Sequence, residues 1–414
     1  MMSGGMNDYS KLRDNPQGVQ SLVEKGRFGE GTELKKYIAL LLMVLMMAAV
    51  VTGCSNTATT TVEQPSSGYK IGVVTPTLST SEDEFRAADK MAKKYPDIVK
   101  HITLPENFST EIETGLSQII SLADDPKMKA IIVISGQAGL LPALQKVEET
   151  RPEIITMTAP IWDDPALMSK YVDVNLDTDW VRRGAAIAQK GHEMGAKTII
   201  HYSFPTHLAK EVISQRKDAM EKTCKELGMQ WVEVITPDPQ TGDGTGPMLQ
   251  FLREDIPRQI EKYGPDTVIF GTNCPMYDVI IDEAFKLKFM VVEQCCPTPL
   301  QAYPTVLGLE ISEEDAWNFP KLNAMISEKA AAAGMTGRLG GWPMPATVFM
   351  PEFAVELAKR MIEDPSFNYN DIDTLNQFAK EVANSEVSFS RFKAKEDGAE
   401  YPNYFVMIMN TILY

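Results

Sequence analysis

The sequence predicts an α/β protein built from two lobes, each a doubly wound parallel sheet, joined by a hinge. From Gly68 onward, short runs rich in Val and Ile alternate with amphipathic helical segments, and the β–α step recurs every roughly 20 to 35 residues. Several apolar runs are continuous, which is typical of parallel strands covered on both faces. The candidate strands are too many for one ordinary sheet, so we expect two sheets.

The first apolar segment of the chain stands outside this alternation. Tyr37–Val51 holds fifteen uncharged residues and follows Lys35 and Lys36. This segment is shorter than the roughly 20 apolar residues that span a membrane. Basic residues followed by a short apolar segment are typical of a signal peptide. Val51–Cys54 resembles a bacterial lipobox, which implies cleavage before Cys54 and a diacylglycerol on its thiol. The alternative is a buried cysteine after a core helix.

The domain boundaries follow from these two patterns. The polar segment after the lipobox is too poor in apolar residues to form a core and predicts a flexible tether. The first sheet is expected to end near Val174–Asp179, where Asp179 offers an N-cap for a helix beginning at Trp180. The predicted parts are an N-terminal extension with the lipoprotein signal peptide (1–53), the tether (54–67), an N-terminal lobe (68–177 plus about 336–385) and a C-terminal lobe (178–335 plus about 386–414).

The individual elements are predicted from apolar runs for strands and from apolar residues at helical spacing for helices. Helical periodicity covers 112–123, 209–227 and 349–362, and Gly228 ends the second of these segments. After Ile311 the pattern is mostly helical. The predicted strands are Lys70–Thr75, Ile98–Leu104, Ala130–Ser135, Ile154–Thr158, Tyr171–Leu176, Thr198–Ser203, Trp231–Thr236, Thr267–Gly271, Phe289–Glu293, Val306–Ile311 and a β-like run at Asn403–Met409.

The charge and the absence of known motifs narrow the function classes. The formal net charge is −16, from 40 Lys and Arg against 56 Asp and Glu, which argues against a nucleic-acid partner because an acidic surface repels phosphates. The sequence contains no P-loop, no G-x-S-x-G and no deaminase motif. It therefore predicts no cofactor, no metal and no catalytic residue. An enzyme would have to rely on carboxylates, with Asp163 and Asp177 as candidates.

The order of these features resembles a known fold family. The lipobox, the Thr- and Ser-rich tether, the opening KIGVVTPT and two successive β–α series resemble a type I periplasmic-binding-protein fold. The chain is similar to an uncharacterised bacterial lipoprotein family, a domain of unknown function. It is more loosely similar to basic membrane protein and purine-nucleoside receptor lipoproteins. The resemblance implies a ligand held in a cleft between two hinged lobes. LacI-type regulators share the fold but need an N-terminal helix-turn-helix, where this chain has the signal and tether.

The candidate ligand-binding residues follow the predicted strands, because ligands of open parallel sheets bind beyond the carboxyl ends of the strands. Trp162 and Trp342 are expected to offer aromatic walls to a planar ligand, or else to pack between lobes or on the surface. Asp163 is expected to accept hydrogen bonds from the ligand, or else to form a turn. The candidates are Thr75, Thr77, Gly136, Gln137, Trp162, Asp163 and Asp177 in the first lobe, Ser203, Phe204, His207, Asn273 and Gln294 in the second, and Trp342 in a later loop.

The cysteines other than Cys54 divide into two groups. Cys224 lies on the apolar face of a predicted helix and is expected in the core. Cys274 and the pair Cys295–Cys296 follow neighbouring strands, so their thiols could meet. Three outcomes stay open for them: free thiols, a disulfide, or a metal site with His207. No CxxC or HExxH pattern supports the last.

These patterns together predict a membrane-anchored, extracytoplasmic solute-binding lipoprotein that closes two lobes on a small polar ligand. Its expected partners are that ligand, the membrane through the lipid on Cys54, and an ABC permease. The alternative is an extracytoplasmic ligand sensor for a membrane signalling protein. A carboxylate-dependent enzyme is the third interpretation.

Overall fold

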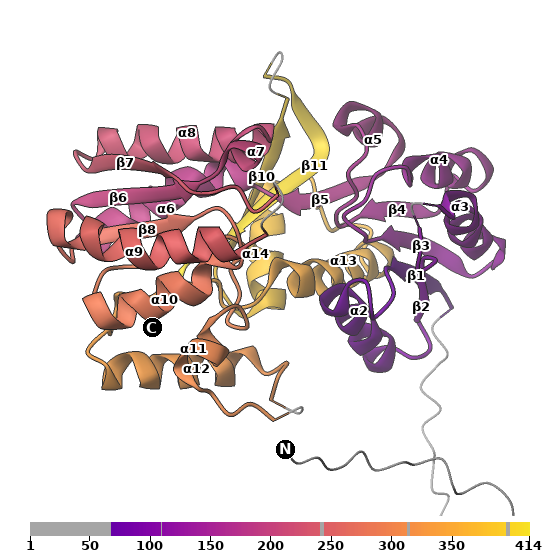
Figure 1. The fold of residues 1–414 in the computed structure, drawn as a ribbon. Coiled ribbons are helices and arrows are strands. Elements are labelled where there is room, and N and C mark those ends of the chain that lie inside the picture. The colour runs from indigo at the N-terminus through magenta and orange to yellow at the C-terminus, as the bar shows by residue number, and fades with distance from the viewer. Residues whose placement is uncertain (1–67, 109, 241–243, 313–314, 395–397) are drawn as a thin grey trace, which may run out of the picture. The chain divides into compact units, whose positions relative to one another are not determined.

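The computed structural model describes residues 68–108, 110–240, 244–312, 315–394 and 398–414, all within one unit that runs from Ser66 to Tyr414. The predicted signal peptide, lipobox, Cys54 and tether lie outside the described residues. The alternation of strands and helices forms two lobes, each with a parallel sheet that carries helices on both faces (Figure 1). The predicted fold class is confirmed. Within the described residues, no helix is both long and apolar enough to cross a membrane.

The sheet of the first lobe has seven strands in the order β10-β11-β5-β4-β3-β1-β2. All neighbouring pairs are parallel except β10 and β11, which are antiparallel. Continuous burial along β1 shows why its Val and Ile run is unbroken: both faces of the sheet are covered. The strands are β1 (Lys70–Thr75), β2 (Val99–Thr103), β3 (Met128–Val133), β4 (Ile155–Thr158), β5 (Val174–Thr178), β10 (Val387–Lys393) and β11 (Glu400–Met409).

Two sets of helices cover the two faces of this sheet. Gly72 allows close packing between sheet and helix, because a Cβ there would meet Leu122 Cδ1 at 2.8 Å. One face packs against α2 (Glu82–Lys94), α13 (Ala346–Glu363) and α14 (Ile372–Ala383). The other face packs against α3 (Ile112–Ser121), η1 (Leu122–Asp124), α4 (Leu141–Thr150) and α5 (Pro165–Tyr171).

The sheet of the second lobe contains β7 (Gln230–Ile235), β6 (Thr198–Ser203) and β8 (Thr267–Gly271), in that order and all parallel. The predicted strand Phe289–Glu293 appears only as isolated bridges, from Val268 to Met290 and from Val291 to Leu339. One apolar core lies under α6 (Trp180–Glu193) and α8 (Glu211–Glu226). The other apolar core of this lobe is formed with α9 (Gly246–Tyr263), α10 (Met276–Leu287), α11 (Tyr303–Leu307) and α12 (Phe319–Ala332). The short helix α7 (Pro205–Leu208) directly follows β6.

The chain crosses between the lobes three times. The first crossing joins β5 to α6, where Asp179 Oδ1 accepts a hydrogen bond from Arg182 N at 2.9 Å, so the predicted N-cap is confirmed. The second joins β9 (Gly340–Gly341) to α13, and the third joins β11 to β12 (Ile412–Leu413). β9 and β12 pair with each other. The two lobes are thus joined by three segments of the chain.

The lobe assignment of the C-terminal hairpin differs from the prediction. Residues from about 386 onward were expected in the C-terminal lobe, but β10 and β11 belong to the sheet of the first lobe. Tyr404–Met407 pairs with Asn175–Thr178 of β5. An unpaired β5 edge would leave backbone donors and acceptors without partners. The chain returns to the second lobe only at β12.

Two element predictions are also corrected. Val306–Ile311 is not a strand, because its first residues belong to α11, which begins beside Pro304 and ends where Gly308 adopts a φ of 59°. Proline is favoured in the first turn of a helix, and glycine accepts the left-handed conformation that ends one. The strand predicted from Tyr171 begins only at Val174, since Tyr171 is the last residue of α5.

Candidate functional site

A cavity of about 460 Å³ lies where strand ends of the first lobe face a loop of the second lobe. The ends of β3, β4 and β5 contribute to it, as expected for a ligand site in an open parallel sheet. Its lining residues are Asp83, Glu84, Ser135, Gly136, Ala159, Pro160, Trp162, Pro345, Ala346, Thr347 and Met350 from the first lobe, Asp177, Thr178, Trp180 and Trp342 from the crossings, and Cys296, Pro297 and Thr298 from the second lobe.

Three tryptophans give the cavity its aromatic surface: Trp162, Trp180 and Trp342. Trp162 is 64% exposed although it is large and apolar. Its ring lies over Gly136, where an added Cβ would come within 3.6 Å of the indole. An exposed indole at a cavity offers area for a planar or ring-shaped ligand at little entropic cost.

The other two indoles are held by a buried guanidinium. Arg183 is 1% exposed, and its Cζ lies 5.3 Å from the Trp180 ring centroid and 5.4 Å from that of Trp342. Its Nε forms a 2.5 Å ion pair with Glu293. Cation–π contacts of this kind fix ring orientation as well as adding stability. Trp180 and Trp342 are therefore positioned before any ligand arrives.

Three carboxyl groups line the cavity, and burial raises the pKa of each. The pKa of Asp177 rises to about 7, and that of Glu84 also to about 7. The pKa of Asp83 rises as well, although Thr347 Oγ1 donates a hydrogen bond to its Oδ2 at 2.6 Å. Near neutral pH, Asp177 and Glu84 can therefore both donate and accept hydrogen bonds.

Four of the thirteen residues proposed from the sequence line this cavity: Gly136, Trp162, Asp177 and Trp342. The other four candidates of the first lobe lie outside the lining. Asp163 accepts hydrogen bonds from Gly139 N, Leu140 N and Leu141 N at the start of α4, so it caps a helix. Thr75 is buried against His101, Thr77 bonds to Glu106, and Gln137 contributes a carbonyl oxygen to Trp162 N.

The five candidates of the second lobe also lie outside the cavity lining. Ser203 and His207 both bond to Thr272 Oγ1, at 2.8 and 3.1 Å, and Phe204 stacks on His207 with ring centroids 4.5 Å apart. Gln294 is fully buried, and its Nε2 donates to Thr298 O and Gln301 O. Asn273 is half-buried, and its Oδ1 has no partner among the described residues. Ser203 and His207 thus use their polar atoms within the protein, because they lie beside Thr272 near the ends of adjacent strands.

The sequence analysis missed several residues of the cavity, above all Trp180, Asp83 and Glu84. Trp180 directly follows the N-cap Asp179, which the sequence identified, so its place at a crossing could have suggested a role. Asp83 and Glu84 lie in the first turn of α2, where acidic residues are common, so the sequence did not mark them as site residues. Only the packing of α2 beside α13 brings them to the cavity.

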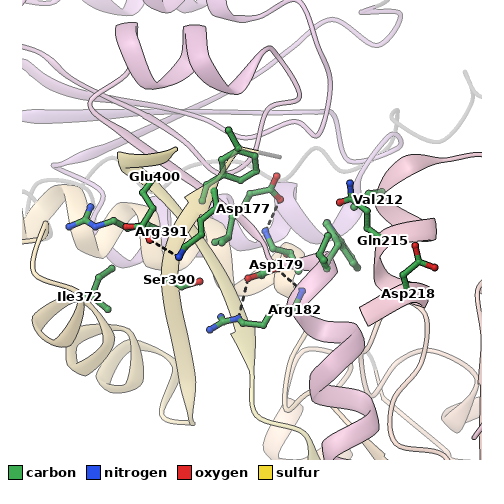
Figure 2. Close-up of a pocket in the computed structure, with 17 residues that line it drawn as sticks. Asp177, Asp179, Arg182, Val212, Gln215, Asp218, Ile372, Ser390, Arg391 and Glu400 are labelled. Carbon is green, nitrogen blue, oxygen red and sulfur yellow. Dashed lines mark hydrogen bonds and ion pairs between the residues drawn. The ribbon is translucent and has the colours of Figure 1, made fainter. Parts of the chain in front are cut away.

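A second hollow, of about 1100 Å³, lies beside the same crossing and is lined by α6, α8 and the β10–β11 hairpin (Figure 2). Asp177, Thr178 and Trp180 line both spaces. Many of its charged side chains are paired within the protein, including Arg182 with Asp179 and Lys393 with Glu400. The first cavity is the better candidate for a ligand site, because it gathers several strand ends and three indole rings.

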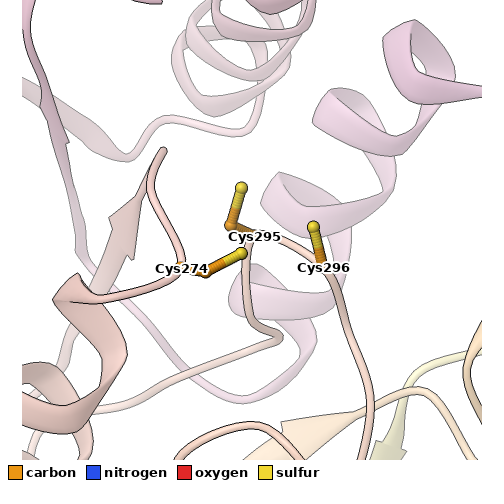
Figure 3. A group of neighbouring side chains, drawn as sticks. All are labelled: Cys274, Cys295 and Cys296. Carbon is orange, nitrogen blue, oxygen red and sulfur yellow. The ribbon is translucent and has the colours of Figure 1, made fainter. Parts of the chain in front are cut away.

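The thiols of Cys274, Cys295 and Cys296 lie within 4.8 Å of one another on two neighbouring loops (Figure 3). They are free, and the predicted meeting of these thiols is confirmed. Cys224 is buried in the core as predicted. Hydrogen bonds from Cys274 and Cys296, together with the nearby guanidinium groups of Arg216 and Arg183, hold the pKa of Cys295 well below its usual range.

Comparison with known proteins gives a family and relatives. The sequence model of a family described as "Protein of unknown function (DUF3798)" matches residues 69–340. Two proteins of Treponema pallidum (strain Nichols), both described as "Uncharacterized protein", are similar. One is 32% identical over 178 residues, which cover 41% of this chain and 80% of the relative. The other is 25% identical over 222 residues, which cover 53% of this chain and 100% of the relative.

Two solved structures are also similar. A protein from Clostridium difficile 630, provisionally named a transcriptional regulator, is 41% identical with a TM-score of 0.79, covering 84% of this chain and 99% of that chain. A protein described as a sugar ABC transporter from Actinomyces odontolyticus ATCC 17982 is 11% identical with a TM-score of 0.51. The match covers 84% of this chain and 96% of that chain. The second likeness shows the fold alone, which is that of type I periplasmic binding proteins with two lobes.

Proposed function

The chain belongs to the DUF3798 family, and from this premise and the cavity between the lobes we propose that it is a solute-binding protein. The observation that carries the proposal is the meeting of three indole rings with the carboxyl groups of Asp83, Glu84 and Asp177 in one cavity beside the ends of β3, β4 and β5. Such convergence of apolar walls with a few polar groups is typical of small-molecule sites. Closure of the lobes would exclude water from the bound ligand.

The cavity chemistry supports a ligand with a ring face and several hydroxyl or amine groups. The indole of Trp162 would cover the ring face, because it is exposed and lies beside the strand ends. Asp83, Glu84 and Asp177 would bond to the polar groups of the ligand. The pKa values of Glu84 and Asp177, both raised to about 7, leave donor and acceptor forms of these two groups near neutral pH. The volume of about 460 Å³ suits a small molecule.

We further propose an extracytoplasmic location, with the chain anchored through a lipid on Cys54 and delivering its ligand to an ABC permease. The support for the anchor is the order of Lys35, Lys36, the apolar segment Tyr37–Val51 and Cys54 in the sequence. The support for delivery is the fold, which is shared with a protein described as a sugar ABC transporter. Adjacent genes for a permease and an ATPase would favour this role.

The binding proposal is tested by thermal unfolding of the mature chain at pH 7 against sugars, nucleosides, amino acids, amines and short acids. A ligand of the folded state raises stability by mass action, by about 2.7 kcal/mol at one hundred times its Kd. We expect one chemical class to raise the Tm, and Trp162→Ala to abolish that rise. The matched control is Leu167→Ala, an exposed apolar residue outside the cavity, which keeps the rise.

Two outcomes would count against solute binding. In the first, none of the compound classes changes the Tm of the wild-type protein. In the second, a compound raises the Tm of the wild type and of Trp162→Ala equally, which would place its site elsewhere. Trp162→Phe should retain part of the effect, because it keeps an aromatic face at the cavity.

A ligand-responsive regulator is the second candidate, and the provisional name of the 41% identical Clostridium difficile protein favours it. In that role the same cavity would bind an effector, and lobe closure would alter contacts with a signalling partner. The net charge of −16 weighs against direct DNA contact. Recovery of the intact cellular protein with DNA and not with membranes would favour the regulator.

A further inference from the structure

We propose that the thiols of Cys274, Cys295 and Cys296 form a binding site for one thiophilic metal cation, either Zn²⁺ or Cu(I), at the edge of the ligand cavity. Their three Sγ atoms lie within 4.8 Å of one another (Figure 3). Soft thiolate ligands select these two ions over harder cations such as Mg²⁺ and Ca²⁺. The proposal does not require solute binding, because only Cys296 of the three lines the cavity.

The spacing of the sulfur atoms fits such an ion. With Zn–S bonds of about 2.3 Å, sulfur atoms around one ion lie about 3.8 Å apart in a tetrahedral site and about 4.0 Å apart in a trigonal one. The limit of 4.8 Å in this structure is within about 1 Å of both values. The Cys296 side chain is exposed, so its thiol can adjust toward an ion without moving a core residue.

The two loops that carry the thiols are fixed by buried hydrogen bonds. Arg183 donates to Cys295 O at 2.7 Å and to Gln294 O, while it forms an ion pair with Glu293. The Tyr277 hydroxyl lies 3.1 Å from Gly271 O and 3.2 Å from Glu293 O, which joins the loop after β8 to the loop of the cysteine pair. Preorganised loops of this kind lower the cost of assembling a metal site.

The cation would have three protein ligands and one open position. Among the described residues, no histidine, carboxylate or fourth cysteine joins the group. His207 is held by Thr272 Oγ1 at 3.1 Å, so the site with His207 that the sequence left open is not formed here. Cys296 faces the cavity, so water or a ligand atom could complete a Zn²⁺ site. Cu(I) would be bound by the three thiolates alone.

The test uses the mature chain, purified without metal and kept reduced under nitrogen. One arm titrates Zn²⁺ against a chromophoric chelator, and a second arm titrates Cu(I) against a Cu(I)-specific chelator. We expect one ion per chain in one arm, together with a higher Tm for the loaded protein. Cys274→Ser and Cys296→Ser should each weaken binding at least about tenfold. The arm that gives the tighter complex identifies the ion.

The matched control is Cys224→Ala, which removes the one described cysteine outside the cluster and should leave binding unchanged. Thermal unfolding of each metal-free variant checks that it is folded, so that weaker binding is not mistaken for misfolding. The proposal is overturned if neither ion binds with a stoichiometry near one, or if Cys224→Ala weakens binding as much as the serine variants. A disulfide among the three cysteines in protein saturated with either ion would also overturn it.

Discussion

At the scale of single residues, Trp162 and Trp342 line the same cavity but differ in exposure. Trp162 is 64% exposed, whereas Trp342 is 1% exposed. Trp342→Ala would leave a void in the core and should lower the free energy of unfolding by about 3–5 kcal/mol. Trp162→Ala removes little buried surface, so we expect a change below about 1 kcal/mol. Urea unfolding of both variants checks this, and equal losses would contradict a ligand-facing role for Trp162.

Asp177 gives a prediction about pH. Burial raises its pKa from 3.8 to about 7 in the folded chain, so the folded state keeps a proton that the unfolded state has lost. Stability should therefore fall as the pH rises from about 4 to about 7. Asp177→Asn removes this dependence. We expect the Tm of the variant, relative to the wild type, to rise by a few degrees between pH 5 and pH 8.

Parallel curves of Tm against pH for the two proteins would contradict the raised pKa of Asp177. Tyr404→Phe is a useful control, because the Tyr404 hydroxyl bonds to Asp177 and lowers its pKa. Without that hydroxyl, the dependence on pH should extend to higher pH. Ligand affinity measured over the same range would show which protonation state of Asp177 the ligand requires.

At the scale of elements, the packing of α6 on α8 depends on one glycine. A Cβ added to Gly184 would meet Arg216 O at 2.1 Å, and a backbone atom cannot move aside as a flexible side chain can. Gly184→Ala should therefore push the helices apart and cost at least about 1–3 kcal/mol. Chemical unfolding measures this loss.

Gly191→Ala on the same helix is the matched control for Gly184→Ala. The nearest atom to a Cβ at Gly191 is Val268 Cγ2 at 3.0 Å, which belongs to a side chain. We expect a smaller loss, because that methyl group can shift slightly. If both variants lost the same stability, helix propensity or the unfolded state would explain the effect better than the close approach of α6 and α8.

The elements that the sequence predicted best are those buried on both faces. β1, β6 and β8 have the predicted bounds because continuous apolar runs of this length have few other stable placements. The run from Val306 was misassigned because a short apolar segment fits a buried strand or a buried helix equally well. Pro304 in the first turn and Gly308 at the C-terminal end favour the helix that the structure contains.

At the scale of the whole molecule, the proposed membrane anchoring depends on Cys54. We expect the wild-type protein to fractionate with membranes and to incorporate labelled palmitate, whereas Cys54→Ala should do neither, because a thioether-linked lipid needs the thiol. Cys224→Ala is the control and should remain anchored. If the Cys54→Ala protein stayed with membranes without incorporating palmitate, the lipobox prediction would be contradicted. The membrane attachment would then be the uncleaved apolar segment.

The cavity between the lobes is likewise a property of the whole molecule. Its lining residues run from Asp83 to Met350 and belong to both lobes and two of the crossings. The rule that ligands bind at strand ends selected Gly136, Trp162 and Asp177, which line this cavity. It also selected Asp163 and Ser203, whose polar atoms are used within the protein. Strand-end position alone does not show which side chains remain free for a ligand.

The sequence by itself determined the fold class, the two-lobe division and the strands with buried faces, because hydrophobic periodicity is a local property of the chain. Tertiary structure alone decided that β11 completes the first sheet, that Glu84 and Trp180 reach the cavity, and that Cys274 meets Cys295 and Cys296. These arrangements depend on sheet order and on side-chain direction across long separations. Neither is encoded in the spacing of residues along a single segment.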